Sequence, residues 1–291
     1  MNNKPSYTTE MLMALAGFSL WTISDAAVRY LKDYPTLLIA FLGSFLSVVL
    51  LCMISPFLGG FRETLTRPQL KLRLFRGILL AGSGVCSFYV FANLDMATAY
   101  AIIFAAPLLA KVLSVFITGE NIRPRSWAIT SLGFIGVLIV IRPGMIPINL
   151  GAISALILAF LFALGYVMSR YIKDENQTLL SMAIFQYLFV TLATAYPAYT
   201  AYQGMQIGFS LYEYSALFII SAAAISGSIL VAKAFSIAPT QVIAPVHYIQ
   251  ILWGTLLSAF LFSEMPDQWT FIGGGVITLS GLLLIKFSRP V

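Results

Sequence analysis

Long apolar stretches separated by short polar breaks dominate the chain. An apolar run of about 20 residues matches the hydrocarbon thickness of a bilayer, so the pattern predicts membrane-spanning helices. We place ten of them, at roughly 10–31, 35–58, 73–94, 98–119, 126–142, 149–170, 179–202, 213–235, 240–262 and 268–288. The longest connection, Gly59 to Leu72, leaves no room for a soluble domain. The predicted fold class is an all-α integral membrane protein with ten transmembrane helices.

The fourth span, between Asn93 and Trp127, differs from a plain membrane anchor in two ways. Pro107 lies in mid-span, where it removes a backbone hydrogen bond and favours a kink. Lys111 lies inside the same apolar run, where a charge is costly unless it is paired or faces water. A helix that is both bent and charged at membrane depth indicates a helix that lines a pathway.

A weaker copy of this span lies near the C-terminus, from Phe235 to Trp269. It contains Pro245 and ends at Glu264, as the first copy contains a proline and ends at Glu120. The copy predicts two five-helix repeats, residues 1–145 and 146–291. Because five is an odd number, the second repeat starts on the other side of the membrane, and the two repeats are inverted.

Composition and charge agree with this prediction. Hydrophobic residues make up 59% of the chain and charged residues 10%, whereas soluble domains carry about 25% charged residues. With the N-terminus inside, 13 of the 17 lysines and arginines fall on the cytoplasmic side and three on the opposite side. This asymmetry predicts cytoplasmic termini in a bacterial inner membrane, and it explains the net charge of +6 without a nucleic-acid partner.

Several short motifs, in order along both halves, resemble those of one family. They are Arg76-Gly77, Phe88-Tyr89, Pro107, Gly119-Glu120, Trp127 with Gly133 and Gly136, Arg142-Pro143-Gly144, and then Pro245, Tyr248, Trp253, Glu264 and Gly275. The chain resembles the drug/metabolite transporter superfamily, specifically its EamA-type members. The resemblance implies ten helices in two inverted repeats around a central cavity, and transport of small organic metabolites without nucleotide hydrolysis. The first helix, with Trp21 and Asp25, looks similar to the S-adenosylmethionine and riboflavin uptake branch.

The fourth span carries a candidate substrate face. Tyr100, Phe104, Pro107 and Lys111 are spaced at i, i+4, i+7 and i+11, which is one face of a continuous helix. The aromatic rings can stack on a planar ligand, and the ammonium can meet an anionic group. The alternative is that Lys111 snorkels to the cytoplasmic interface.

The first span carries a second candidate. Asp25 can bind a cationic group or a proton, and Trp21, one turn earlier, can stack on a planar ring. The alternative is an ion pair between Asp25 and Arg29, four residues later.

Coupling and gating have three further candidates. His247, the single histidine, can carry a coupling proton or can simply be hydrogen-bonded near a helix start. Glu120 and Glu264 can each latch a gate by pairing with a basic residue, such as Arg123 or Lys32, or can be ordinary interfacial carboxylates.

The predicted site therefore has two groups of residues. The predicted substrate-binding residues are Trp21, Asp25, Tyr89, Asn93, Tyr100, Phe104, Lys111, Tyr166, Tyr248 and Gln250. The predicted gating or coupling residues are Pro107, Glu120, Pro245, His247 and Glu264.

The predicted function is secondary transport by alternating access, of a heteroaromatic metabolite such as S-adenosylmethionine or riboflavin. The sequence has no P-loop, no HExxH and no cysteine cluster, so we expect no metal and no cofactor. The expected partners are a small-molecule substrate and the lipid bilayer, with no prediction of an oligomeric state. The alternatives are an exporter of the same superfamily, a channel, and an integral-membrane enzyme acting on lipid-like substrates.

Overall fold

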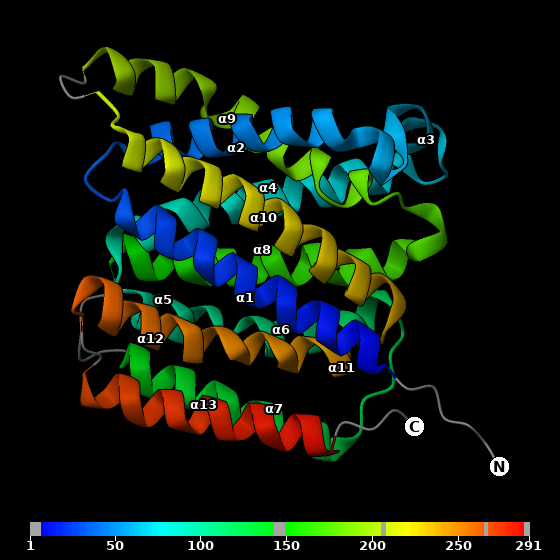
Figure 1. The fold of residues 1–291 in the computed structure, drawn as a ribbon. Coiled ribbons are helices and arrows are strands. Elements are labelled where there is room, and N and C mark those ends of the chain that lie inside the picture. Colours follow the sequence, from blue (N-terminus) through cyan, green and yellow to red (C-terminus); the bar gives the residue numbers. More distant parts are fainter. Residues whose placement is uncertain (1–6, 143–148, 205–207, 265–266, 288–291) are drawn as a thin grey trace.

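The structure, a computed structural model, describes residues 7–142, 149–204, 208–264 and 267–287, and these residues form helices and short connections without a strand. Long helices run side by side along one direction in a single bundle (Figure 1). The helices of the first half are α1 (Thr8–Tyr30), α2 (Thr36–Ile54), η1 (Ser55–Leu58), α3 (Gly60–Thr66), α4 (Leu70–Asn93), α5 (Met96–Ile103), α6 (Ala106–Ile117) and α7 (Pro124–Ile141). Those of the second half are α8 (Leu150–Ile172), η2 (Asp174–Asn176), η3 (Leu180–Met182), α9 (Ile184–Gln203), α10 (Leu211–Ile237), α11 (Thr240–Ile243), η4 (Ala244–Tyr248), α12 (Ile249–Phe262) and α13 (Gln268–Phe287).

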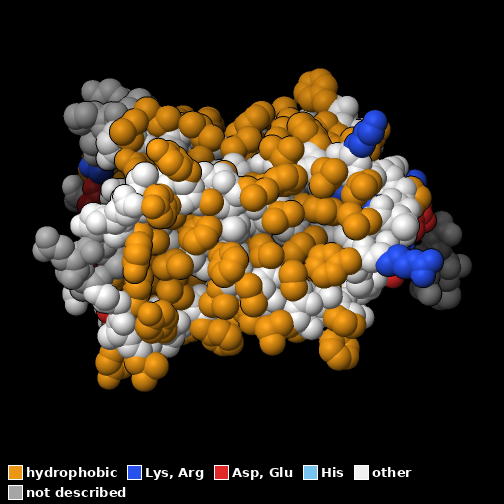
Figure 2. Space-filling view, turned by 90° about the horizontal axis from the view of Figure 1, so that it is seen from above, with side chains coloured by type: hydrophobic (Ala, Val, Ile, Leu, Met, Phe, Trp, Pro, Cys, Tyr) orange, Lys and Arg blue, Asp and Glu red, His pale blue; other side chains and the backbone are white. Residues whose placement is uncertain are grey.

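Seven helical segments of the described chain are long and apolar enough to cross a membrane. They are Thr8–Tyr30, Thr36–Leu58, Leu70–Asn93, Met96–Ile117, Leu150–Ile172, Leu211–Ile237 and Thr240–Phe262. Hydrophobic side chains cover the face in Figure 2, and the charged side chains gather at the two ends of the helices. Large apolar side chains such as Phe116 and Phe260 are more than four-fifths exposed. The chain is therefore an all-helical, multi-pass membrane protein.

The long helices pair across the two halves of the chain. Helix α1 packs on α10, α8 on α4, α2 on α9, and α7 on α13. A Cβ atom added to Gly17 would lie 3.0 Å from the carbonyl oxygen of Gly227, so α1 and α10 cross with their backbones nearly touching. Gly136 and Gly273 bring α7 and α13 together in the same way, at 2.7 and 2.6 Å.

Both predicted interruptions are present. The fourth predicted span is two helices, α5 and α6, which meet at Phe104 and Ala105, with Pro107 in the first turn of α6. The later span consists of α11, η4 and α12, with Pro245 in the first turn of η4. A proline in a first turn is tolerated because its missing N–H would have no partner inside the helix.

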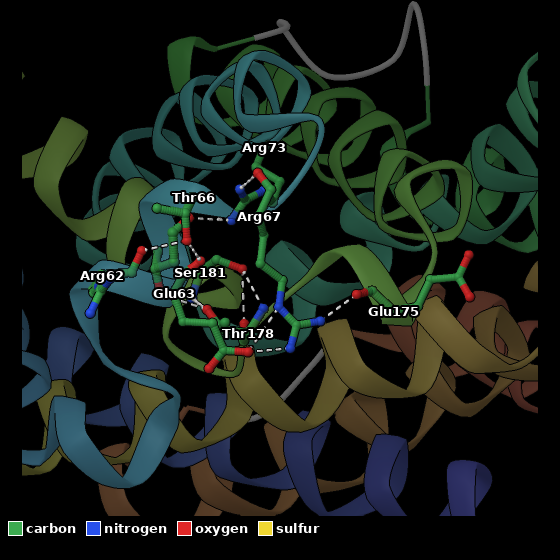
Figure 3. Close-up of polar contacts among 9 residues, drawn as sticks. Arg62, Glu63, Thr66, Arg67, Arg73, Glu175, Thr178 and Ser181 are labelled. Carbon is green, nitrogen blue, oxygen red and sulfur yellow. Dashed lines mark hydrogen bonds and ion pairs between the residues drawn. The ribbon is translucent and has the colours of Figure 1, made fainter.

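The connection Gly59 to Leu72 is more structured than the sequence pattern predicts, because it contains α3. The Thr64 Oγ1 atom lies 2.6 Å from Thr178 Oγ1 in the α8–α9 connection, and Arg67 bonds both the Glu63 carboxylate and the Glu175 carbonyl (Figure 3). The buried Arg73 donates to the Thr64 and Arg67 carbonyl oxygens at 2.6 and 2.7 Å. These contacts tie α3 to the end of the bundle where α1 begins (Figure 1).

Candidate substrate cavity

A cavity of about 130 Å³ lies in the centre of the bundle. It is bounded by α1, α2, α4, α5, α8, α9 and α10 and by the junction of η4 with α12. The polar and aromatic residues that line it include Trp21, Ser24, Asp25, Ser44, Ser47, Ser83, Ser87, Phe88, Tyr100, Phe162, Tyr166, Gln186, Tyr187, Ser228, His247 and Gln250.

Asp25 forms an acidic corner of this cavity. Its carboxylate accepts a hydrogen bond from the Tyr100 hydroxyl at 2.7 Å and a longer one from Ser87 at 3.4 Å. In the described part of the chain it has no ion pair with a lysine or arginine. The expected alternative of a pair with Arg29 is therefore wrong, because Arg29 bonds Glu264 instead. A negative group without a positive partner is available to a cationic ligand.

Aromatic rings form the wall beside this corner. The Trp21 ring meets Phe162 and Tyr166 edge-on, with ring centres 5.6 Å apart in both cases. His247 is stacked between Phe18 and Phe162 at 4.6 and 5.0 Å. The Trp21 Nε1 atom donates to the Ala224 carbonyl at 3.2 Å, which holds the indole in place. The predicted residues Trp21, Tyr166 and His247 thus meet on one wall.

An amide and two hydroxyls form a corner that the sequence analysis missed. Gln186 Nε2 donates to Ser228 Oγ at 2.7 Å, and the Tyr187 hydroxyl lies 2.9 Å from the same oxygen. The available signal was the Gln-Tyr pair inside the apolar run of α9. The predicted wall residue Gln250 also lines the cavity, and its amide donates to the Phe18 carbonyl at 3.1 Å.

Lys111 does not share the cavity face with Tyr100, contrary to the expected spacing. The helix is interrupted at Phe104 and Ala105, so the spacing expected on one continuous helix does not carry across it. The buried Lys111 ammonium instead bonds two residues of α7, Ser126 and Thr130. It joins α6 to α7 outside the lining of the cavity.

Four other predicted wall residues also lie outside the lining. Phe104 is buried behind it, against Tyr100 and Tyr248. Tyr248 faces α13, where a Cβ on Gly281 would lie 2.6 Å from its ring. Asn93 is exposed and donates to the backbone carbonyl of Tyr89, the fourth of these residues, on the same helix. All of these residues lie in or next to helices that the sequence predicts. Their spacing along the helices did not show which face of each helix lines the cavity.

Both glutamates bond an arginine, although not the expected ones. At one end of the bundle, Arg29 bonds Glu264 and donates to the Ala92 carbonyl at the end of α4, at 3.1 Å. At the other end, Arg170 lies 3.9 Å from Glu120 and donates to the Ile237 carbonyl at the end of α10, at 2.6 Å. Arg123 and Lys32, the nearby candidates in sequence, form neither pair.

The fold and the cavity define a multi-pass membrane protein with a central small-molecule cavity. Residues 8–142 match the model of the EamA-like transporter family, so the predicted EamA-type resemblance is confirmed over these residues. A solved crystal structure of 18% sequence identity has a TM-score of 0.71 and covers 97% of this chain and 99% of its own, which shows a shared fold.

Curated relatives over nearly the whole chain are transporters. The S-adenosylmethionine uptake transporter of Rickettsia prowazekii is 29% identical over 92% of this chain and 89% of its own length. The pseudopaline exporter CntI of Pseudomonas aeruginosa is 23% identical over 96% of both chains. An uncharacterized transporter of Helicobacter pylori is 25% identical over 90% of this chain and 89% of its own.

Proposed function

We propose that the protein is a secondary transporter that moves a cationic, heteroaromatic metabolite of the S-adenosylmethionine type across the bacterial inner membrane. The observation that carries this proposal is the Asp25 carboxylate, which lies beside an aromatic wall in a central cavity and has no ion-pair partner among the described residues. The names of the Rickettsia relatives support the same substrate.

The charges of the cavity support a cationic ligand over a neutral one. Among the described residues that line it, Asp25 is joined by no lysine or arginine. S-adenosylmethionine carries a sulfonium, an ammonium and a carboxylate, so its net charge balances one buried carboxylate. Riboflavin is uncharged and leaves Asp25 without a counter-ion.

The aromatic wall supports a planar ring. Stacking of a base on an aromatic side chain contributes roughly 1–3 kcal/mol where substitution has measured it. A micromolar dissociation constant corresponds to about 8 kcal/mol. Two stacking contacts on Trp21 and Phe162, together with the charge on Asp25, therefore account for a large part of such an affinity.

Helix pairing supports ten crossings in two inverted repeats, divided near residue 145. If α1 corresponds to α8 and α4 to α10, the pair α1–α10 becomes the pair α8–α4 when the repeats are exchanged. The pair of Arg29 with Glu264 likewise becomes the pair of Arg170 with Glu120. Helix α1 begins and α13 ends at the same end of the bundle (Figure 1), which agrees with two cytoplasmic termini.

Alternating access then uses these two arginine–glutamate pairs. Each pair joins the first helix of one repeat to the interrupted helix of the other, at opposite ends of the cavity. Separation of one pair while the other holds opens one side only. The prolines of the interrupted helices, Pro107 and Pro245, provide the bends about which the halves move.

Export is the second candidate direction, because the relative from Pseudomonas aeruginosa is named an exporter. Counterflow measures exchange in either direction and so tests the carrier without assuming one.

The test uses the purified protein in vesicles loaded with unlabelled S-adenosylmethionine. We expect saturable accumulation of the labelled compound, and we expect Asp25→Asn to weaken its binding roughly 10- to 100-fold. The same substitution is expected to change the affinity for riboflavin, which has no charge for Asp25 to pair with, very little. Asp33→Asn, an exposed carboxylate in the α1–α2 connection, is the matched control. The proposal fails if the wild type does not exchange S-adenosylmethionine, or if Asp25→Asn exchanges it as well as the wild type does.

A further inference from the structure

We infer that Gln186, Tyr187 and Ser228 form a subsite that makes hydrogen bonds to the edge of the substrate ring. This subsite selects rings that carry an N–H donor. This inference rests on the proposed function, because it names the part of the same ligand that determines its selection.

Of the two polar atoms of the Gln186 side-chain amide, one forms a hydrogen bond and the other forms none among the described residues. Gln186 is the third residue of α9 and is 8% exposed. Its Nε2 atom donates to Ser228 Oγ at 2.7 Å. In the described residues its Oε1 atom is buried and accepts no hydrogen bond.

A buried acceptor without a partner is unfavourable, and it is relieved when a donor reaches it. Gln186 lines the central cavity, so a bound ligand can supply that donor. The carboxylate of Asp25 lies on α1 and is already held by Tyr100 of α5. The charge of the ligand and the edge of its ring are thus bound by different helices.

Two hydroxyls lie beside this acceptor. Tyr187 and Ser228 share one hydrogen bond of 2.9 Å, in which either oxygen can be the donor. A hydroxyl donates or accepts as its neighbour requires, so this pair can adapt to a ring nitrogen next to the ligand's donor. An amino group beside a ring nitrogen, as on a 6-aminopurine, presents this combination of one donor and one acceptor.

The alternative role for Gln186 is to hold α9 against α10, as polar side chains often do between membrane helices. The two roles differ in what a substitution changes. A residue that only joins helices affects stability and all ligands alike, whereas a residue that reads the ring edge affects one ligand more than another.

The test compares two ligands of the full-length protein. One is S-adenosylmethionine, and the other is its analogue with hydrogen in place of the 6-amino group. We expect the wild type to bind the analogue about tenfold more weakly. Gln186→Leu is expected to weaken the binding of S-adenosylmethionine by about tenfold and to leave the binding of the analogue nearly unchanged. The two affinities then become equal.

Two further variants keep the test interpretable. Gln203→Leu makes the same change at the exposed end of α9 and is expected to keep the wild-type ratio. Ser228→Ala is a milder change that frees the Gln186 amide to rotate, and it is expected to reduce the ratio even if Gln186→Leu does not fold.

The inference is overturned if the wild type binds both ligands equally well, while the proposed function survives that result. It is also overturned if Gln186→Leu or Ser228→Ala lowers stability but keeps the wild-type ratio. If the wild type binds neither ligand, the proposed function fails, and this inference fails with it.

Discussion

The two interrupted helices share a backbone design but begin in different ways. In the first, α5 starts at Asp95, whose carboxylate accepts the backbone N–H of Thr98 at 2.8 Å. In the second, α11 starts at Pro239, which has no side-chain acceptor. The N–H of Thr240 donates instead to Glu120, beyond the end of α6, at 3.0 Å. The second interrupted helix therefore depends on the first for its cap.

Their side chains also differ in use. In the first segment, the Tyr100 hydroxyl donates to Asp25 in the cavity, and the Lys111 ammonium bonds Ser126 of α7. In the second segment, His247 and Gln250 line the cavity. The copies thus share the break in the helix, whereas their ligand-facing chemistry has diverged. A cavity lined by both segments can then bind an asymmetric ligand.

The largest expected effect comes from Gly254→Ala, which breaks the contact between the two segments. A Cβ atom there would lie 2.2 Å from the Tyr100 ring, so the ring must shift, which disturbs the hydrogen bond from its hydroxyl to Asp25. Overpacking of this kind costs typically about 1–3 kcal/mol. We expect a lower thermal unfolding midpoint and at least about a tenfold loss in binding of S-adenosylmethionine. Gly275→Ala, where an added Cβ meets nothing within 4 Å, is the control. Equal behaviour of the two variants would contradict the role of Tyr100.

Lys111→Met is the next test, because it removes the hydrogen bonds that join the first interrupted helix to α7. Hydrogen bonds to charged groups contribute about 1.5–3 kcal/mol, so the unfolding midpoint is expected to fall. The affinity for S-adenosylmethionine should stay within about twofold, since Lys111 lies outside the lining of the cavity. Binding by calorimetry and unfolding by fluorescence separate the two effects. A large loss of affinity at unchanged stability would restore Lys111 as a ligand contact.

A comparison of Asp95→Ala with Glu120→Ala sharpens the difference in capping. Loss of an N-cap costs about 1 kcal/mol, so both variants should be destabilised by similar amounts. Glu120→Ala also removes the partner of Arg170, and we expect it to change the exchange rate in counterflow more than Asp95→Ala does. The same exchange rate in both variants would show that the Arg170–Glu120 pair does not latch this end.

The smallest effect concerns Asp267, which precedes α13 and bonds Arg142 at 2.6 Å. Hydrogen bonds from Thr270 and the charge of Arg142 hold the pKa of Asp267 below its ordinary value of 3.8. A lowered pKa means that the ionised form stabilises the fold above pH 3.8 and that this stabilisation disappears as pH falls through the lowered pKa. The side chain is 44% exposed, so the effect is well under about 1 kcal/mol. Asp267→Asn should lower the unfolding midpoint slightly at pH 7 and not at pH 2; an equal loss at both values would contradict the ionic contribution.

The helices and their interruptions were accessible from sequence because apolar run length and proline position are local properties. Spans such as 240–262 match the structure in both ends. The direction in which side chains face was less accessible, as Lys111 demonstrates. Its spacing was assigned on one continuous helix, whereas the structure interrupts that helix at Phe104 and Ala105, and the ammonium bonds α7. Gln186 was missed because an amide in an apolar run has no distinctive spacing. The partners of Glu120 and Glu264 depend on contacts between distant helices, and the nearest cations in sequence were the wrong choice.

The four tryptophans occupy different surroundings. Trp21 lines the cavity, whereas Trp253 and Trp269 are 41% and 42% exposed on the outer surface and Trp127 is partly exposed near the start of α7. Indole emission responds to nearby charge, polarity and stacking. Replacement of the three outer tryptophans by phenylalanine would leave a chain whose intrinsic fluorescence comes from the ligand cavity alone, and the colour and intensity of that emission would report occupancy without any label.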